Sequence, residues 1–108
     1  MDLLALSKRI REELTPADLS ELRLELAGEY AYLNSQLIEI LKDKPLVWQS
    51  IRYGGECKSD TAAEREWQRT QDGQKETLLR MELKTIDKLS SAIKSRIDVL
   101  SGEARMQF

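Results

Sequence analysis

Apolar residues recur at steps of three or four from Leu79 to Phe108, with polar residues between them. This spacing places the apolar side chains on one face of a helix, which contains no proline and only one late glycine, Gly102. A long and narrow apolar face has to be covered by another helix, so the pattern predicts packing between helix faces. The seam comprises Leu79, Leu83, Ile86, Leu89, Ile93, Ile97, Leu100, Ala104 and Phe108.

An earlier helix is predicted by a second apolar series with near-heptad spacing. Thr15 suits the N-cap position of this helix, and Pro16 suits its first helical position. Pro45 disfavours helical geometry in the residue before it, which predicts that the helix ends between residues 42 and 44. The series comprises Leu19, Leu22, Leu26, Tyr30, Leu33, Leu37 and Ile40.

The segment between the two seams lacks helical periodicity, and Gly54 and Gly55 break it. A capping-box sequence from Thr61 to Glu64 predicts the start of the next helix. We therefore predict an all-α fold: a single domain built on an antiparallel helical hairpin with coiled-coil-like packing. Its parts are a short helix at about 2–13, a helix at about 16–43, a connecting segment at about 44–59 and a long helix at about 60–104, in which Gly73 marks the place for a kink.

The composition suits a long-helix protein, because 33% of the 108 residues are charged and aromatic residues are scarce. The net charge of −2 provides no overall field toward nucleic acid or a membrane. The N-terminal residues lack the basic start and cleavage site of a signal peptide, and no apolar run is long enough to span a membrane. The lone cysteine, Cys57, favours a reducing cytoplasm, which is that of the host cell if a phage encodes the chain.

The sequence contains no histidine, so Cys57 lacks the usual base of a cysteine nucleophile. The single cysteine also excludes a cysteine-based zinc site. The carboxylate pairs Glu12 with Glu13 and Glu64 with Glu66 lack the histidines that complete a carboxylate metal site on facing helices. We therefore expect a protein that is not an enzyme, with no catalytic residue, metal, cofactor or small-molecule substrate.

Arg80, Lys84 and Lys88 stand at successive i+4 positions, where like charges repel by a few tenths of a kcal/mol per pair. A row of this kind is suited to a phosphate backbone or to an acidic partner. One alternative is that the row is simply solvated. The other is pairing within the hairpin, because an antiparallel arrangement brings an acidic stripe of the preceding helix beside this row. That stripe comprises Asp18, Glu21, Glu25 and Glu29.

Aromatic and basic residues are mixed around the break, a mixture that single-stranded nucleic acid uses for stacking. The candidate stacking residues are Trp48 and Tyr53, close to the cations Lys44, Arg52 and Lys58. The alternative is a cap over the open end of the hairpin, in which Trp48 packs with Trp67.

A homo-oligomer is predicted because a second set of apolar residues lies off the two seams, where a lone hairpin leaves it exposed. This set comprises Leu24, Tyr32, Ile38, Leu78, Met81 and Val99. The candidate oligomer seam comprises Leu79, Leu83, Ile86, Ile93, Ile97 and Leu100.

The segment Ser91-Ala92-Ile93-Lys94-Ser95-Arg96, with the amphipathic end that follows it, resembles the C-terminal part of the UvsY family of phage recombination mediators. The plan is also similar: a small, histidine-poor helical chain with an aromatic and glycine-containing break, here Tyr53-Gly54-Gly55. The resemblance implies a ring-forming oligomer that binds single-stranded DNA. It also implies a protein that helps to load a recombinase onto strands covered by single-strand binding protein.

The chain departs from that family where the basic DNA-binding pair is found. The pair lies just before the aromatic break, where this chain has Val47 and Gln49, with Lys44 and Arg52 offset. The family's DNA-binding residues are therefore not carried over one by one.

Two functions of different classes stay open. The first is a recombination or replication accessory protein that binds single-stranded DNA and protein partners. The second is a helical protein–protein interaction module without a nucleic-acid role, such as a phage-encoded inhibitor of a host system or an assembly adaptor. The candidate residues for binding nucleic acid or an acidic partner are Lys44, Arg52, Lys58, Arg80, Lys84, Lys88, Lys94 and Arg96.

Overall fold

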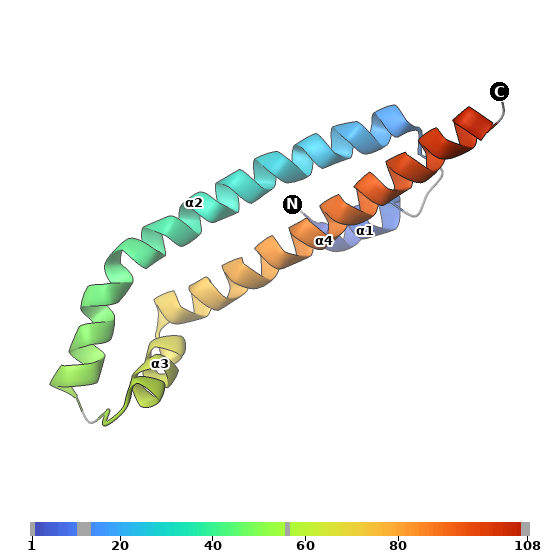
Figure 1. Ribbon diagram of the computed structural model, residues 1–108. Helices are drawn as coiled ribbons and strands as arrows, with labels where there is room; N and C mark the ends of the chain where they lie inside the picture. The colour runs from blue at the N-terminus through green and yellow to red at the C-terminus, as the bar shows by residue number, and fades with distance from the viewer. Residues whose placement is uncertain (1, 11–13, 56, 107–108) are drawn as a thin grey trace. The chain divides into compact units, whose positions relative to one another are not determined.

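The computed structural model describes residues 2–10, 14–55 and 57–106, and the side chains up to residue 102 of the last range. Its regular structure consists of the helices α1 (Leu3–Ile10), α2 (Pro16–Gly54), α3 (Asp60–Arg69) and α4 (Gln71–Met106) (Figure 1). The prediction of an all-α antiparallel hairpin with a long C-terminal helix is confirmed. No helix in these ranges combines the length and the apolar character that crossing a membrane requires.

The described side chains do not cover every residue that the sequence singles out. Residues 11–13 of the expected first helix, including Glu12 and Glu13, lie outside the described residues, as does Phe108 of the C-terminal seam. The side chain of Ala104 lies outside the described side chains.

The first of two compact units combines the described residues of Met1–Tyr32 with those of Leu83–Phe108. It therefore contains α1, the first part of α2 and most of α4. Thr15 caps α2, because its hydroxyl oxygen accepts from the Asp18 backbone N–H (3.2 Å) while the Asp18 carboxylate accepts from the Thr15 backbone N–H (3.2 Å). The buried apolar side chains are Leu6, Leu19, Leu22, Leu26, Leu83, Ile86 and Ile93.

The second unit is formed by Leu33–Glu82 and contains the rest of α2, α3 and the start of α4. Its buried apolar side chains include Trp67 of α3, which is 1% exposed. The buried carboxylate of Glu76 lies among them. The other buried apolar members are Leu33, Leu37, Ala63 and Leu79.

The predicted end of the second helix near residues 42–44 is wrong, because α2 continues through Pro45 to Gly54. Figure 1 shows α2 changing direction in its green part, and Pro45 lies inside this helix. This is the expected result of losing one backbone hydrogen bond inside a helix. The residues after Pro45 keep the buried face, with Trp48 and Ile51 half-buried, so packing outweighs the local preference. The connecting segment shrinks from 44–59 to residues 55–59.

The predicted single helix over 60–104 is also wrong, because it is divided into α3 and α4 at Thr70 rather than kinked at Gly73. The backbone of Thr70 is extended, with φ −69° and ψ 160°. Its hydroxyl donates to the Trp67 carbonyl (2.6 Å) and accepts from the Gly73 backbone N–H (3.0 Å). Thr70 therefore ends α3 and caps the N-terminus of α4 with one side chain.

Gly73 is required at this junction by close approach rather than by its backbone conformation. A Cβ atom placed on Gly73 would overlap the backbone carbonyl of Trp67. The first turn of α4 therefore packs directly against the last turn of α3, and no larger residue fits without moving one of the two helices.

We expect Gly73→Ala to lower the free energy of unfolding by about 1–3 kcal/mol, because the methyl group forces the junction apart. The matched control is Gly28→Ala in α2, where a Cβ atom meets nothing within 4 Å. That control should raise the free energy of unfolding by about 0.4–1 kcal/mol, since alanine favours the helix. Urea denaturation followed by circular dichroism measures both. Equal effects of the two substitutions would contradict the close approach at Gly73.

Candidate functional site

A cluster of charged and aromatic side chains occupies the centre of the second unit. Lys44 Nζ of α2 lies 3.0 Å from Glu76 Oε1 of α4 and 3.3 Å from Glu64 Oε1 of α3. The same ammonium group lies 5.3 Å from the ring centroid of Trp67, within the range of a cation–π contact. Trp48 Nε1 donates to Glu64 Oε2 (3.2 Å). We call Lys44, Trp48, Glu64, Trp67 and Glu76 the Lys44 cluster.

Two residues considered for nucleic-acid binding therefore have partners inside the chain. The charge of Lys44 is offset by two carboxylates, and the indole N–H of Trp48 is bound to one of them. Trp67 is buried beside them. This arrangement fits the alternative of a cap formed by Trp48 and Trp67 better than an open stacking surface.

Sequence reasoning missed Glu76, although a signal was present. Glu76 stands three residues before Leu79, which is a seam position, and Lys44 stands four residues after Ile40, the last member of the first seam. A charged residue in an apolar series is a candidate for burial with an opposite charge. Two such residues, one on each arm of a hairpin, predict an ion pair between the arms.

The end of α2 is held by Arg52. Its Nε lies 3.0 Å from Asp60 Oδ1, and its Nη1 donates to the carbonyl of Cys57 (3.2 Å). The guanidinium carbon lies 5.1 Å from the ring centroid of Tyr53, whose side chain is largely exposed. Lys58 is exposed as well. Of the candidates around the break, only Tyr53 and Lys58 thus present their side chains to solvent.

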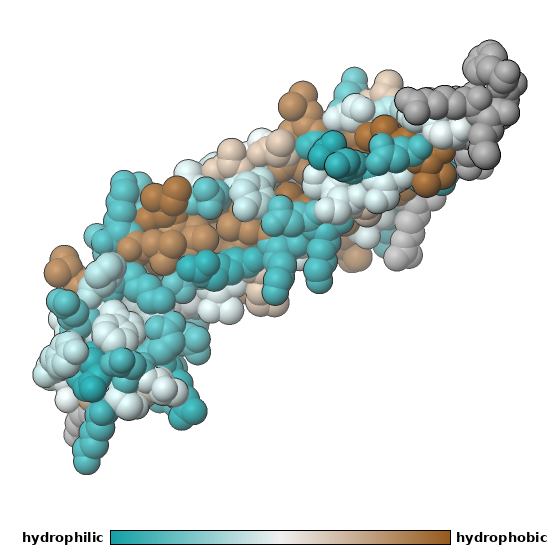
Figure 2. All heavy atoms as spheres, in the orientation of Figure 1, coloured by the Kyte–Doolittle hydropathy of each residue, from teal (hydrophilic) through white to brown (hydrophobic). Residues whose placement is uncertain are grey.

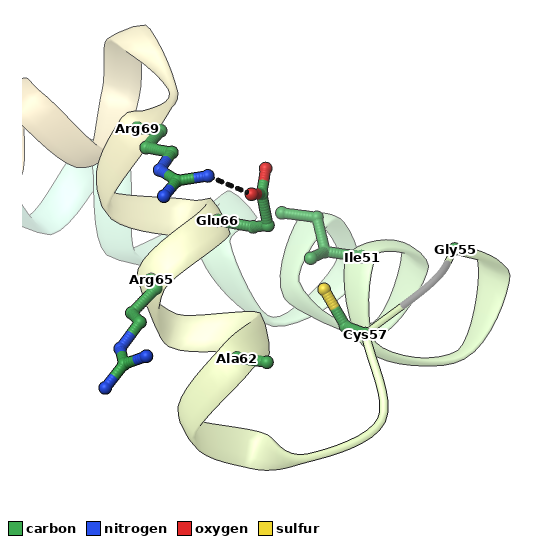
Figure 3. A pocket seen from close by; sticks show the side chains of 7 residues that line it. All are labelled: Ile51, Gly55, Cys57, Ala62, Arg65, Glu66 and Arg69. Carbon is green, nitrogen blue, oxygen red and sulfur yellow. Dashed lines mark hydrogen bonds and ion pairs between the residues drawn. The ribbon is translucent and has the colours of Figure 1, made fainter.

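An open pocket of about 630 Å³ lies beside this segment, between the end of α2 and α3 (Figure 3). The Cys57 sulfur points into it toward Ile51, while Arg65 points away from the other labelled side chains. The Glu66 carboxylate is paired with Arg69 Nη1 at 2.7 Å. The lining residues are Ile51, Gly55, Cys57, Ala62, Arg65, Glu66 and Arg69.

The basic row on α4 is exposed. Arg80 Nε lies 3.8 Å from Glu76 Oε2, at the edge of the Lys44 cluster. Lys84 and Lys88 are exposed, as are Lys94 and Arg96 further along the helix, and the ion pairs among the described side chains include none of these four. The expected pairing of this row with the acidic stripe of α2 is therefore not found among the described side chains.

The C-terminal seam is largely covered by the chain's own helices. Leu79, Leu83, Ile86 and Ile93 are buried, and Ile97 and Leu100 are half-buried. The buried members of the candidate oligomer seam belong to the cores of their own units.

The apolar residues off the seams are exposed, as expected for a lone hairpin. Their exposed fractions run from 47% for Ile38 to 75% for Leu24. Figure 2 shows brown, hydrophobic side chains reaching the surface between teal, hydrophilic ones. The exposed set comprises Leu24, Tyr32, Ile38, Leu78, Met81 and Val99.

Comparisons with known proteins identify no relative of this chain. No protein-family model, no curated protein and no solved structure matches the chain.

We expect Lys44→Met to lower the free energy of unfolding by about 3 kcal/mol, because it leaves the buried Glu76 carboxylate without its main partner. Replacing both residues, as Lys44→Met with Glu76→Met, should recover most of this loss. The matched control is Lys42→Met, which breaks an exposed pair with Glu39 and should cost about 0.5 kcal/mol or less. Urea denaturation measures all three variants. A loss equal to that of the control would show that Glu76 does not depend on Lys44.

Proposed function

We propose that the chain is a non-enzymatic helical interaction module that assembles with copies of itself and binds protein partners through the outer faces of its helices. The observation that carries this proposal is the exposed apolar set, above all Leu24 at 75% and Leu78 at 58% exposed. Burial of such a side chain contributes roughly 1.5–3 kcal/mol, so a partner that covers several of them offsets much of the roughly 4–15 kcal/mol that association costs.

The spacing on α2 supports the proposal. A single exposed apolar residue is normal on a protein surface. Leu24, Ala31 and Ile38, however, follow each other at heptad steps, and all three are exposed. A second heptad series outside the buried one is typical of a helix that packs against two neighbours.

The state of the single cysteine supports association inside a cell. Cys57 is a free thiol, and the proposed module uses no disulfide. We place its action in a reducing cytoplasm, since exposed side chains and not covalent links would hold the assembly together.

We expect light scattering at micromolar concentration to give a mass that is a multiple of the 12.4 kDa of one chain. The double variant Leu24→Ala with Val99→Ala should lower that mass while leaving the helical circular dichroism unchanged, because both side chains are exposed. Leu46→Ala removes a similarly exposed leucine and serves as the control. A mass of one chain for the unaltered protein would overturn the proposal of self-assembly.

A second candidate function is weak binding of single-stranded DNA by the basic row on α4. The specific observation is that Lys84 and Lys88 are exposed without a carboxylate partner among the described side chains. The resemblance of residues 91–96 to the recombination mediators supports the same function. Under it, the further partners are a recombinase or a single-strand binding protein.

We expect any such binding to weaken as salt rises, since bound phosphates release counterions. Fluorescence anisotropy with labelled oligo-dT across a salt series measures the slope. Lys84→Ala with Lys88→Ala should reduce that slope, whereas Lys42→Ala on α2 should leave it unchanged. Absence of binding at low salt would leave only the interaction module.

A further inference from the structure

The first unit carries two exposed helix faces of opposite charge. On α2, Glu21 and Glu25 are exposed one turn apart, on either side of Leu24 in the sequence. On α4, Lys84 and Lys88 are exposed one turn apart on the side of the helix away from the buried Ile86. We call the first pair with Leu24 the acidic face and the second pair with Val99 the basic face.

The charged side chains of both faces are exposed and form no ion pair with other described side chains. The ion pairs among these side chains include neither the two glutamates nor the two lysines. In each pair, the like charges at i and i+4 repel each other. A surface of the opposite sign with the same one-turn spacing would relieve that repulsion on both sides at once.

Both faces also have room and apolar surface for a helix. Gly28 lies one turn after Leu24 on α2, and a Cβ atom placed on it meets nothing within 4 Å. Ala92 lies one turn after Lys88 on α4 and is exposed. Small residues at these positions allow a second helix to approach closely, while Leu24 and Val99 supply apolar surface to cover.

We propose that the acidic face on α2 of one copy docks on the basic face on α4 of another copy. This inference rests on the proposed self-assembly and names the surfaces that meet. A second copy is favoured over nucleic acid as the occupant because it matches both faces in charge sign and spacing, whereas phosphates would cover the basic face alone. A pair joined by one such contact leaves one acidic face and one basic face open. These two faces either meet within the same pair, which closes a two-fold dimer, or bind further copies, which extends the assembly head to tail into a ring or a chain.

The test reverses the charges of one face at a time. Glu21→Lys with Glu25→Lys, and separately Lys84→Glu with Lys88→Glu, should each weaken self-association at least about tenfold, because like charges then meet. Combining all four substitutions in one chain should restore assembly, as should mixing the two double variants. Sedimentation at several protein concentrations measures the association, and circular dichroism checks the fold.

Three controls make the outcome decisive. Lys8→Glu with Lys42→Glu changes the net charge by the same amount as the lysine reversals but should leave association unchanged. If a reversed variant does not fold, glutamine at the same positions removes the charges without adding new ones and should also weaken association. Anisotropy with oligo-dT on the Lys84→Glu, Lys88→Glu variant tests the nucleic-acid alternative, since this variant has a lysine pair on neither face and should lose phosphate binding.

The results separate this inference from the proposal beneath it. An unaltered protein that assembles, with reversals that have no effect or are not rescued by each other, overturns the docking of these two faces and leaves self-assembly standing. A protein that is monomeric throughout overturns both. Loss in each double variant with recovery in the fourfold variant supports both.

Discussion

The second unit depends on an ion pair that joins the two arms of the hairpin. Lys44 and Glu76 stand at the spacing of the apolar series of α2 and α4, and the charge of the half-buried Lys44 makes the burial of the Glu76 carboxylate tolerable. α2 has to continue past Ile40 to bring Lys44 to this point. We infer that the pair selects the register of α2 against α4, because a shift by one residue would leave a buried carboxylate without a partner.

The junction at Thr70 allows a third helix segment, α3, to contribute side chains to the Lys44 cluster. Since α3 and α4 are separate helices, α3 is free to bring Glu64 and Trp67 to Lys44 while α4 brings Glu76. One hydroxyl group serves both helix ends, and Gly73 lets the two helices meet without an intervening loop. The Lys44–Glu76 ion pair and the junction between α3 and α4 thus support each other within one compact unit.

Periodicity in the sequence predicted the helical hairpin and most of its core. Leu26 and Ile86, for example, lie on the two predicted seams and are buried. The break at Thr70 lies in a stretch, residues 68–77, that contains no apolar side chain. The capping sequence near Thr61 and the seam that begins at Leu79 were assigned to one helix across this gap, because a threonine that ends one helix and caps the next leaves no distinctive apolar pattern.

The end of α2 and the candidate binding residues were harder to predict for another reason. The rule for proline is a local steric preference, and at Pro45 the contacts of neighbouring side chains outweigh it. Lys44 and Arg52 read as free cations because their carboxylate partners come from distant positions, Glu76 and Asp60. The exposure of Arg80, Lys84 and Lys88 on α4 could be predicted from their spacing alone, because these residues lie on the side of the helix opposite the buried seam.

The division of the chain between the units has a consequence for how it folds. The second unit is one continuous stretch, Leu33–Glu82, whereas the first is assembled from both ends of the chain. Contacts that are close in sequence form with little loss of loop entropy, so the continuous unit is expected to form first. Its formation shortens the effective loop between Tyr32 and Leu83. The two segments of the first unit then pack on each other, starting at the residues next to the second unit.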